Sequence, residues 1–504
     1  MAVRKVSRWI VCTLAALVFC SVYYFVLRNS IRGAWEILPI MAAMLGGYLL
    51  IHHFDLGRRA FWVCFAVMVV LQCFSMYFLK VIYSSWDVFA VTKNADALVK
   101  GEWFNARYFA RYPNNIAMLL ITTAVYGVTY HLFHFTSLYF MLMVNIFVID
   151  LAILISVRIM RTLMPERAAW RGGILMTLFL PYYLYVPISY TDTFVMPFIV
   201  GIIDLSLSAA RQWDQLRPRR RVLRCCLIGA LCLIAFRIKG SAIVLLIACG
   251  MYFFFRFRLK AFLQSAACLL AGFLVALTVW NAGISALNLI PDEYYYEEQF
   301  PVTHWIMMGL KGHGQWNSED VNGFTMTFSN YDERSAAVNA ELKRRLDALG
   351  PAGLIRQFYF KATTYAWNTG TCNAEQYLGD IADLPVRPNI LHTFILSDGA
   401  NRRPFYLVTQ SYWLLLFGFA VSGFIALLRR GVARLPLLLT LALVGCMMFF
   451  MIWETHPRYV LHFTQVLIMI AAAQMEAFAD LRRRVRIRLL RKSPPVSASE
   501  GGAS

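Results

Sequence analysis

The chain has 504 residues, of which 59% are hydrophobic and 15% are charged, and its mean hydropathy is +0.57. Soluble domains are about half apolar and about a quarter charged, so a single soluble core is excluded. The formal net charge of +20 does not indicate a nucleic-acid-binding protein. The arginines lie in short loops between apolar runs, where they set membrane topology.

Apolar runs of about 20 residues, enough to cross ~30 Å of hydrocarbon, recur along the sequence. They lie near residues 9–27, 35–54, 60–82, 114–134, 136–157, 172–189, 193–210, 224–238, 240–257, 261–285, 406–428, 435–453 and 459–478. The first run has a basic start like a signal peptide, but it is too long for one and we interpret it as a retained helix. The sequence predicts an all-α polytopic membrane protein with about 12 transmembrane helices.

Basic loops predict which helix ends face the cytoplasm. A cytoplasmic N-terminus and three crossings put residues 83–113 outside, whereas the arginine-rich loop 158–171 has to lie inside. Only one crossing fits between them, yet two apolar segments lie there. We expect 114–134 not to cross, because it begins with a helix-start signature at Pro113 and carries several polar residues. The alternative is that 35–54 does not cross, which would place 83–113 inside.

This scheme divides the chain into five parts, with both termini in the cytoplasm. They are two N-terminal transmembrane helices (1–59), a transmembrane module (60–285) with a first external loop (83–134), an extracytoplasmic loop domain (286–405), C-terminal transmembrane helices (406–480) and a basic, disordered cytoplasmic tail (481–504). In the loop domain, helical periodicity over 336–349 stops at Gly350-Pro351. The loop domain has no Asn-x-Ser/Thr sequence, which favours a bacterial cell membrane over a glycosylating compartment.

Ionisable residues gather in the segments that this topology places outside. Asp87 directly follows the third span and precedes the stretch 88–100, whose apolar residues recur at the spacing of an amphipathic helix lying in the interface. Asp87 is either a helix N-cap or a catalytic carboxylate at the membrane surface, and one residue can do both. Asp192 also begins a span on the outer side, so it is either a cap or a substrate-binding residue.

Cations on the outer side oppose the usual distribution of positive charge. Arg237 and Lys239 flank a short span, where a phosphate at the outer leaflet would suit them; the alternative is that they snorkel to lipid headgroups. The short turn 453–459 brings Glu454, His456 and Arg458 into a small volume. These three residues are candidates for substrate binding, and a structural Glu454–Arg458 pair is the alternative.

A glycine-rich stretch in the loop domain mixes aromatic and hydrogen-bonding residues between His304 and Trp316. Aromatic faces with amide and carboxylate partners commonly hold sugars, so both residues are candidates for substrate binding; a plain ordered loop is the alternative. His304 and His313 are nine residues apart and do not make a metal signature. The motifs therefore imply no cofactor and support no divalent metal.

The order of these features along about residues 60–480 resembles the GT-C superfamily of membrane glycosyltransferases, including its protein mannosyltransferase-like and aminoarabinose transferase-like branches. The resemblance rests on Asp87 with the amphipathic stretch after it, the non-crossing segment, Tyr190-Thr191-Asp192, the short span ending at Lys239, and the Glu454–Tyr459 turn. Two features depart from the pattern. Two extra spans precede Asp87, and Asp87 has no adjacent second acid of the kind found in some branches, which argues against a metal-dependent branch.

The resemblance implies a helical bundle with non-spanning juxtamembrane helices and a small extracytoplasmic domain. It also implies inverting transfer of a sugar from a polyprenyl-phosphate carrier in the lipid bilayer to an extracytoplasmic acceptor, with Asp87 as general base and cations on the leaving phosphate. Two alternatives from other classes are a flippase or transporter for lipid-linked sugars and a non-catalytic envelope-assembly protein. Transporters often show internal repeats, and this sequence shows no repeat.

Overall fold

The computed structural model describes residues 2–54, 56–381, 384–428 and 437–492. Helices dominate this part of the chain. The two strands that it contains, β1 (Val81–Ile82) and β2 (Leu384–Pro385), are two residues long and pair antiparallel with Val81 opposite Pro385. The strand pair joins the first external loop to the loop domain. The all-α class expected from the sequence is confirmed.

The first half of the described chain consists of helices that follow the apolar runs and the external loop between them. They are α1 (Ala2–Gly33), α2 (Ile37–His53), α3 (Arg58–Phe78), α4 (Asp87–Lys100), α5 (Ala106–Arg111), η1 (Pro113–Asn115), α6 (Ile116–Phe133), α7 (Leu138–Leu163), α8 (Glu166–Thr177), α9 (Pro181–Leu184), α10 (Thr191–Phe194), α11 (Met196–Arg211), η2 (Trp213–Gln215), α12 (Pro218–Ile238), η3 (Gly240–Ile243), α13 (Val244–Arg256) and α14 (Leu259–Leu287).

The second half contains the loop domain and the last apolar helices. Its helices are α15 (Asp292–Glu298), α16 (Thr303–Gly309), α17 (Ser318–Val321), η4 (Thr325–Thr327), α18 (Tyr331–Lys361), the π-helical turns η5 (Ala362–Ala366) and η6 (Gln376–Asp380), α19 (Ile390–Ile395), α20 (Arg402–Leu428), α21 (Leu437–Ile452), η7 (Pro457–Phe463) and α22 (Thr464–Lys492).

Eight helical stretches are long and apolar enough to cross a membrane, judged by length and composition within the described residues. They are Val6–Gly33, Arg58–Phe78, Pro113–Phe133, Leu138–Leu163, Thr191–Arg211, Leu259–Leu287, Arg402–Leu428 and Pro457–Val485. Three further apolar helices are shorter: Ile37–His53, Gly240–Arg256 and Leu437–Ile452. The chain is therefore a polytopic membrane protein, and the number of about 12 crossings stays a prediction.

The expected span 172–189 is not one helix. It is divided between α8, which ends at Thr177, and the single turn α9, which starts at Pro181. A proline at this point cannot continue the preceding helix, because it lacks the N–H donor. The irregular backbone is buried, and Asn145 of α7 donates to the carbonyls of Tyr185 at 2.8 Å and Val186 at 2.9 Å. Protein contacts thus satisfy polar groups that lipid cannot satisfy.

The C-terminal segment also differs from expectation at its start. Helix α22 continues to Lys492, so residues 481–492 are helical rather than part of a disordered tail. Arginine and leucine are good helix formers, which favours continuation of the helix beyond the apolar part. Residues 493–504 of the predicted tail lie outside the described residues.

Segment 114–134 forms a continuous helix, α6, and the charged helix α4 packs along it. Asp87, at the start of α4, is linked to Asn115 at the start of α6 through Tyr108. Asp96, further along α4, bonds to Thr136, just beyond the end of α6. An upright α6 would carry the charges of α4 into the bilayer with it, which favours an interfacial α6. That α6 does not cross stays a prediction, since the helix is long enough to do so.

The loop domain contains the predicted break at Gly350. Helical hydrogen bonding resumes beyond this residue within α18, but Gly350 itself has φ 58° and ψ 179° and Pro351 follows it, so the helix is kinked there. A positive φ favours glycine, and the following proline removes a backbone donor. The break expected at Gly350-Pro351 is therefore confirmed. Beyond the kink, the second half of α18 approaches α1, where the hydroxyls of Ser21 and Tyr359 lie 2.8 Å apart.

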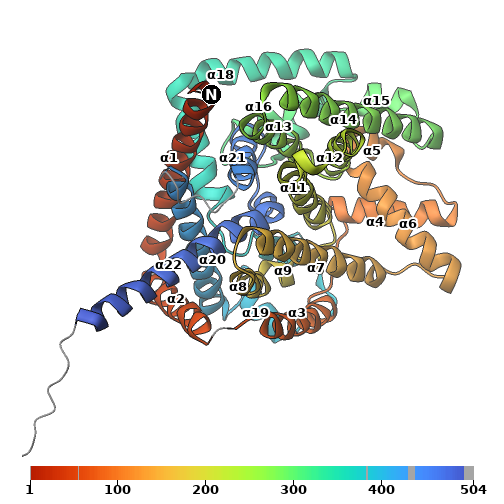
Figure 1. Ribbon diagram of the computed structural model, residues 1–504. Helices are drawn as coiled ribbons and strands as arrows, with labels where there is room; N and C mark the ends of the chain where they lie inside the picture. The colour runs from red at the N-terminus through yellow and green to blue at the C-terminus, as the bar shows by residue number, and fades with distance from the viewer. Residues whose placement is uncertain (1, 55, 382–383, 429–436, 493–504) are drawn as a thin grey trace, which may run out of the picture.

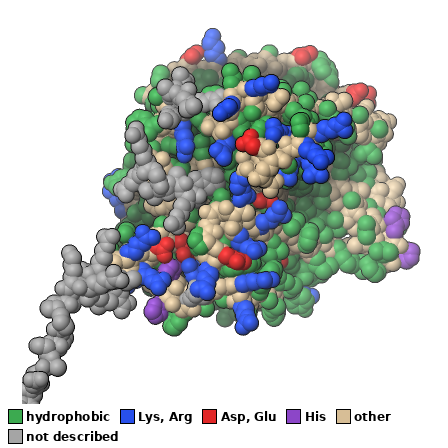
Figure 2. Space-filling view, in the orientation of Figure 1, with side chains coloured by type: hydrophobic (Ala, Val, Ile, Leu, Met, Phe, Trp, Pro, Cys, Tyr) green, Lys and Arg blue, Asp and Glu red, His purple; other side chains and the backbone are tan. Residues whose placement is uncertain are grey.

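Elements from the two ends of the chain lie side by side in the bundle (Figure 1). Helix α1 packs against α20, and α20 packs against α22. Helices α12 and α14 approach most closely at two glycines: a Cβ on Gly229 would lie 2.0 Å from the Leu269 carbonyl oxygen, and one on Gly272 2.0 Å from that of Cys226. Small residues at such crossings let helix backbones touch in a membrane. On the face seen in Figure 2, hydrophobic side chains cover much of the right-hand part of the molecule.

Candidate active site

Segments from five parts of the sequence meet in one place in the structure. We define the Asp87–Arg458 cluster as Trp86, Asp87, Tyr190, Asp192, Lys239, Glu454, His456 and Arg458. Contacts among these residues and their neighbours join the start of α4, the link before α10, the link after α12, the loop domain and the turn between α21 and η7. These are the segments that the sequence predicts to lie on the outer side of the membrane.

Asp87 is half-buried in the first turn of α4. The N-cap of this helix is Trp86, in an extended conformation, and no side chain caps it. The Asp87 carboxylate instead lies within hydrogen-bonding distance of two phenols, that of Tyr108 at 2.5 Å from Oδ1 and that of Tyr190 at 3.0 Å from Oδ2. The N-cap interpretation of Asp87 is therefore wrong, and its carboxylate faces the cluster.

The two phenols around Asp87 remain donors over a wide pH range. Burial, followed by the charge of Asp87, raises the pKa of Tyr108 and of Tyr190 well above the usual tyrosine value. Asn115, fully buried at the start of α6, connects them: its amide nitrogen donates to the Tyr108 hydroxyl at 2.7 Å, and its oxygen lies 2.5 Å from the Tyr190 hydroxyl. Neither Tyr108 nor Asn115 was predicted as a site residue from the sequence, because no spacing rule links them to Asp87.

Asp192 does not act as a cap either, since the N-cap of α10 is Tyr190. Its Oδ1 forms a buried ion pair with Lys239 Nζ at 2.6 Å, and its Oδ2 lies 3.8 Å from Arg458 Nε. Lys239 Nζ also lies 4.0 Å from the centre of the Tyr459 ring. Burial lowers the pKa of Lys239, and the Asp192 carboxylate beside it opposes that shift.

Arg458 is enclosed by aromatic rings and is only 6% exposed. Its guanidinium carbon lies 4.8 Å from the ring centre of Tyr377, 4.9 Å from that of Trp86, and 5.1 and 5.4 Å from those of Tyr459 and Tyr190. Two of its nitrogens, Nε and Nη1, have no hydrogen-bond partner among the described residues. Buried N–H groups without partners are costly, so Arg458 has unused capacity to bind an anion.

The turn that carries Arg458 also buries Glu454 and His456. Burial raises the pKa of Glu454 to about 6, although Arg458 lowers it, and Tyr459 donates to its Oε1 at 3.1 Å. The expected Glu454–Arg458 pair is not among the ion pairs of the described residues. In those residues, the carboxylate paired with Arg458 is that of Asp192. Burial holds the pKa of His456 well below its usual value, so it is neutral, with Nε2 2.9 Å from the Gln376 side-chain oxygen.

The loop domain holds this turn through its backbone. The amide of Glu454 donates to the Trp305 carbonyl at 3.0 Å, and that of Thr455 donates to the Gly314 carbonyl at 2.7 Å. Lys361, at the end of α18, donates from Nζ to the carbonyls of Met451 at 3.0 Å and Trp453 at 2.6 Å. The glycine-rich stretch from 304 to 316 therefore positions residues 453–455 with main-chain bonds.

Three sequence candidates lie outside the Asp87–Arg458 cluster. Arg237 points to α14, where its Nη2 donates to Asn281 at 3.1 Å and its guanidinium lies 5.6 Å from the Trp280 ring centre. His304 is buried in the loop domain, with Nδ1 2.8 Å from the Thr325 hydroxyl, and burial lowers its pKa to about 4. Trp316 is 48% exposed.

Within the described residues, no group of three or more His, Cys, Asp or Glu side chains is arranged to hold a metal ion. The chemically distinctive feature of the site is the pairing of a half-buried carboxylate with buried cations. Tyr190 contacts both parts, because its hydroxyl lies 3.0 Å from Asp87 Oδ2 and its ring also faces Arg458. The arrangement can accept a proton on one side and bind an anion on the other.

A family model described as "Conserved hypothetical integral membrane protein" matches residues 36–478. This match covers α2 to α22 and includes every residue of the Asp87–Arg458 cluster. Neither the curated proteins nor the solved structures contain a match to this chain. By its sequence and by its bundle of apolar helices, the chain belongs to this family of conserved hypothetical integral membrane proteins.

Proposed function

We propose that the protein is an inverting membrane glycosyltransferase that transfers a sugar from a polyprenyl-phosphate carrier to an extracytoplasmic acceptor. One observation carries the proposal: Tyr190 contacts both groups, since its hydroxyl lies 3.0 Å from Asp87 Oδ2 and its ring centre lies 5.4 Å from the Arg458 guanidinium carbon. A reaction that removes a proton from one oxygen and releases charge onto a phosphate needs this combination of groups.

In the proposed reaction, the acceptor hydroxyl oxygen attacks the anomeric carbon of the donor sugar. Its proton passes to Asp87, the bond between the anomeric carbon and the phosphate oxygen breaks, and the electron pair stays on the polyprenyl phosphate. The positive charges of Arg458 and Lys239 stabilise the negative charge that develops on this phosphate. Attack opposite the leaving group inverts the anomeric centre.

The hydrogen bonds around Asp87 leave one carboxylate oxygen available. Asn115 donates to the Tyr108 oxygen, so the Tyr108 hydrogen is directed to Asp87 Oδ1. The hydroxyl oxygen of Tyr190 lies closer to the Asn115 side-chain oxygen, at 2.5 Å, than to Asp87 Oδ2, at 3.0 Å, which favours donation of its single hydrogen to Asn115. Oδ2 is therefore the weaker-bonded oxygen, and it is the one that would receive the acceptor's proton.

The buried cations fit the phosphate end of the donor. Arg458 has two nitrogens without partners among the described residues, Nε and Nη1; they lie on different edges of the guanidinium, and each can donate to a phosphate oxygen. Lys239 is already paired with Asp192, so Asp192 positions this lysine and neutralises part of the charge that would otherwise be buried. Glu454 and His456 complete the wall next to Tyr377 and Tyr459.

The test is transfer of sugar from a synthetic polyprenyl-phosphate donor by the purified protein, compared with Asp87→Asn. Asparagine keeps the size of the side chain and accepts hydrogen bonds at one oxygen, but it cannot take up the proton. Loss of a general base typically costs 10²–10⁴-fold in rate, and we expect a loss on the order of that size. Donor binding and the unfolding temperature should stay close to those of the wild type.

Asp96→Asn is the matched control, because Asp96 belongs to the same helix and bonds to Lys100 and Thr136 outside the cluster. It should transfer sugar normally. Near-normal turnover by Asp87→Asn would exclude Asp87 as the base. Movement of the intact lipid-linked sugar across vesicles without transfer would instead identify a flippase, and neither transfer nor movement would favour an envelope-assembly protein.

A further inference from the structure

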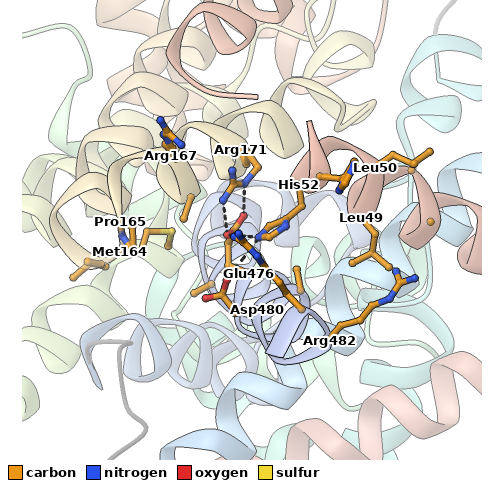
Figure 3. Close-up of a pocket in the computed structure, with 18 of the residues that line it drawn as sticks. Leu49, Leu50, His52, Met164, Pro165, Arg167, Arg171, Glu476, Asp480 and Arg482 are labelled. Carbon is orange, nitrogen blue, oxygen red and sulfur yellow. Dashed lines mark hydrogen bonds and ion pairs between the residues drawn. The ribbon is translucent and has the colours of Figure 1, made fainter. Parts of the chain in front are cut away.

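A second site lies away from the Asp87–Arg458 cluster, where α2, α8 and α22 meet. A cavity of about 1250 Å³ opens between these helices (Figure 3). Its charged lining comes from loops and helix ends that the sequence predicts to face the cytoplasm. The proposed transfer reaction uses none of its residues.

The charged part of the cavity is built around Glu476 of α22. Arg171 of α8 bonds to both of its carboxylate oxygens, at 2.6 and 2.8 Å, and the buried Tyr48 hydroxyl donates to Oε1 at 2.7 Å. His52 Nε2 lies 3.6 Å from Glu476 and 3.8 Å from Asp480. Figure 3 shows His52, Arg171 and Glu476 converging from three helices. This network holds the helices together and fixes the shape of the cavity wall.

Positive charge exceeds negative charge along the lining. Arg167, Arg171, Arg482 and Arg483 line the cavity against two carboxylates, Glu476 and Asp480. Figure 2 shows Lys and Arg side chains gathered beside the C-terminal segment on this face of the molecule. The surplus of arginine matches an anion with several oxygen acceptors.

The remaining lining is apolar and contains open space. Gly46 and Gly47 of α2 line the cavity, and a Cβ added to either would meet nothing within 4 Å. Leu50, also in the lining, is 59% exposed, so this side is open toward the hydrocarbon of a surrounding bilayer. From Ala43 to His53 along α2, the lining changes from small and apolar to polar.

We propose that this cavity binds an anionic phospholipid, with the phosphate headgroup at Arg482 and Arg483 and an acyl chain along Gly46 and Gly47. The charge and the apolar groove occur together, and a soluble phosphate would use only the first of them. Basic pockets between transmembrane helices on the cytoplasmic side bind such headgroups in other membrane proteins. The bound lipid would contact both α2 and α22 and stabilise their packing.

The experiment measures lipid retained by the purified full-length protein in native mass spectrometry, after equal exposure to phosphatidylglycerol and phosphatidylcholine. The wild type should retain phosphatidylglycerol preferentially. The double variant Arg482→Gln/Arg483→Gln should weaken this retention roughly 30-fold, since each basic residue near an anionic lipid surface contributes about fivefold. Arg219→Gln/Arg220→Gln, two exposed arginines at the start of α12 outside the lining, is the matched control and should retain the lipid normally.

A second pair of variants tests the acyl-chain groove without changing charge. Gly47→Leu fills the open space and should displace the lipid, whereas Gly127→Leu on α6, which also has open space around it, should not. Equal retention of lipid by all five proteins would overturn the proposal. Stabilisation of the wild type by inorganic phosphate, equal to that by phosphatidylglycerol and unaffected by Gly47→Leu, would assign the site to a free anion and also overturn it.

Discussion

The hydroxyl of Tyr190 has one hydrogen and two oxygens within reach, one on Asn115 and one on Asp87. Asn115 therefore decides how many hydrogen bonds Asp87 accepts. With Asn115 in place, Tyr190 can donate to the amide oxygen and leave Asp87 Oδ2 open. Asn115 acts on the proposed base through two phenols, so it is a positioning residue rather than a catalytic one.

Replacing Asn115 with leucine should slow transfer while leaving donor affinity close to normal. Without the amide, both phenols donate to Asp87, and the carboxylate becomes a weaker base because its charged form is better stabilised. One net hydrogen bond is worth about 1 kcal/mol, so we expect roughly a fivefold to tenfold fall in kcat with little change in KM for the donor.

Thr129→Val is the control for this change, because Thr129 is buried on the same helix and bonds only to the Tyr126 carbonyl among the contacts described for it. A fall in kcat of the same size in Thr129→Val, or an equal rise in KM for the donor in Asn115→Leu, would mean that Asn115 matters only for the packing of α6.

Arg458 should determine donor affinity rather than the proton transfer. Its replacement by glutamine removes the unpartnered N–H groups and the charge, so donor binding should weaken roughly 10- to 100-fold, the range for a hydrogen bond to a charged group. The donor affinity of Arg458→Lys should lie between those of the wild type and Arg458→Gln, since lysine keeps the charge but lacks the planar guanidinium group. Equilibrium binding of a labelled, non-transferable donor analogue measures the effect.

Arg387→Gln is its matched control, because Arg387 also lies over an aromatic ring, 3.6 Å from the centre of that of Tyr77, outside the cluster. Donor affinity equal to wild type in Arg458→Gln would remove Arg458 from the phosphate site. Equal weakening in both variants would show a general effect of lost cation–aromatic contacts.

Residue type and topology predicted most of the charged members of the site. Cations on the outer side of a membrane oppose the usual distribution of positive charge, and Asp87, Asp192, Lys239, Glu454, His456 and Arg458 do meet. Arg237 was grouped with Lys239 but lies apart, because it belongs to the last turn of α12 and faces α14, whereas Lys239 lies on the extended link after that helix. The aromatic walls from Trp86 and Tyr377 depend on tertiary packing, which no local pattern encodes.

At the scale of elements, α18 ends against the C-terminus of α21 through a buried lysine. Lys361 donates to the carbonyls of Met451 and Trp453, where the negative end of the α21 dipole favours a cation. Burial nevertheless lowers the pKa of Lys361 to about 7, far below the value of about 10.4 in an unfolded chain. The two helix ends at this contact are thus held by a lysine that titrates near neutrality.

This shift predicts that the protein becomes more stable as pH rises from about 7 to about 10. In that window the unfolded chain binds a proton at Lys361 and the folded chain does not, so the free energy of unfolding rises with pH, by up to about 1.4 kcal/mol per pH unit from this group. Lys361→Met should flatten the rise, as measured by thermal unfolding in detergent across this pH range.

Lys343→Met, at an exposed position of the same helix, should leave the pH dependence as in the wild type. If the Lys361→Met and wild-type curves rise in parallel between pH 7 and 10, the lysine is charged in the folded protein and its burial does not neutralise it.

Element boundaries were predictable where a local signal sets them. The kink of α18 follows from glycine and proline at 350 and 351, and the long apolar runs became helices. The helix break within segment 172–189 could not be predicted, since the composition of this segment is that of a membrane span. Its irregular backbone is tolerated because Asn145, on another helix, donates hydrogen bonds to two of its carbonyls.

At the scale of the whole molecule, the segments predicted to lie on one side of the membrane converge. The first external loop, the links before α10 and after α12, the loop domain and the 453–459 turn all contribute to the Asp87–Arg458 cluster. Basic segments predicted to lie on the other side meet around His52 and Glu476 instead. This separation supports the predicted assignment of loops to sides, and which side is cytoplasmic stays a prediction.

Labelling from outside intact cells should therefore distinguish Lys100 from Arg167. Each is exposed and is replaced by cysteine in a background without other reactive cysteines. An impermeant maleimide should modify Lys100→Cys and spare Arg167→Cys until the cells are opened. Modification of both positions, or of Arg167→Cys alone, in intact cells would contradict the topology.

The last part of the site to be synthesised is the turn that carries Arg458. Asp87 and Asp192 leave the ribosome long before that turn, by roughly half a minute at ordinary rates of elongation. Lys239, the ion-pair partner of Asp192, and the aromatic residues Trp86 and Tyr190 also precede that turn in the chain. The proposed site is thus completed late in biogenesis, because a nascent chain that stalls before residue 453 lacks Glu454, His456 and Arg458.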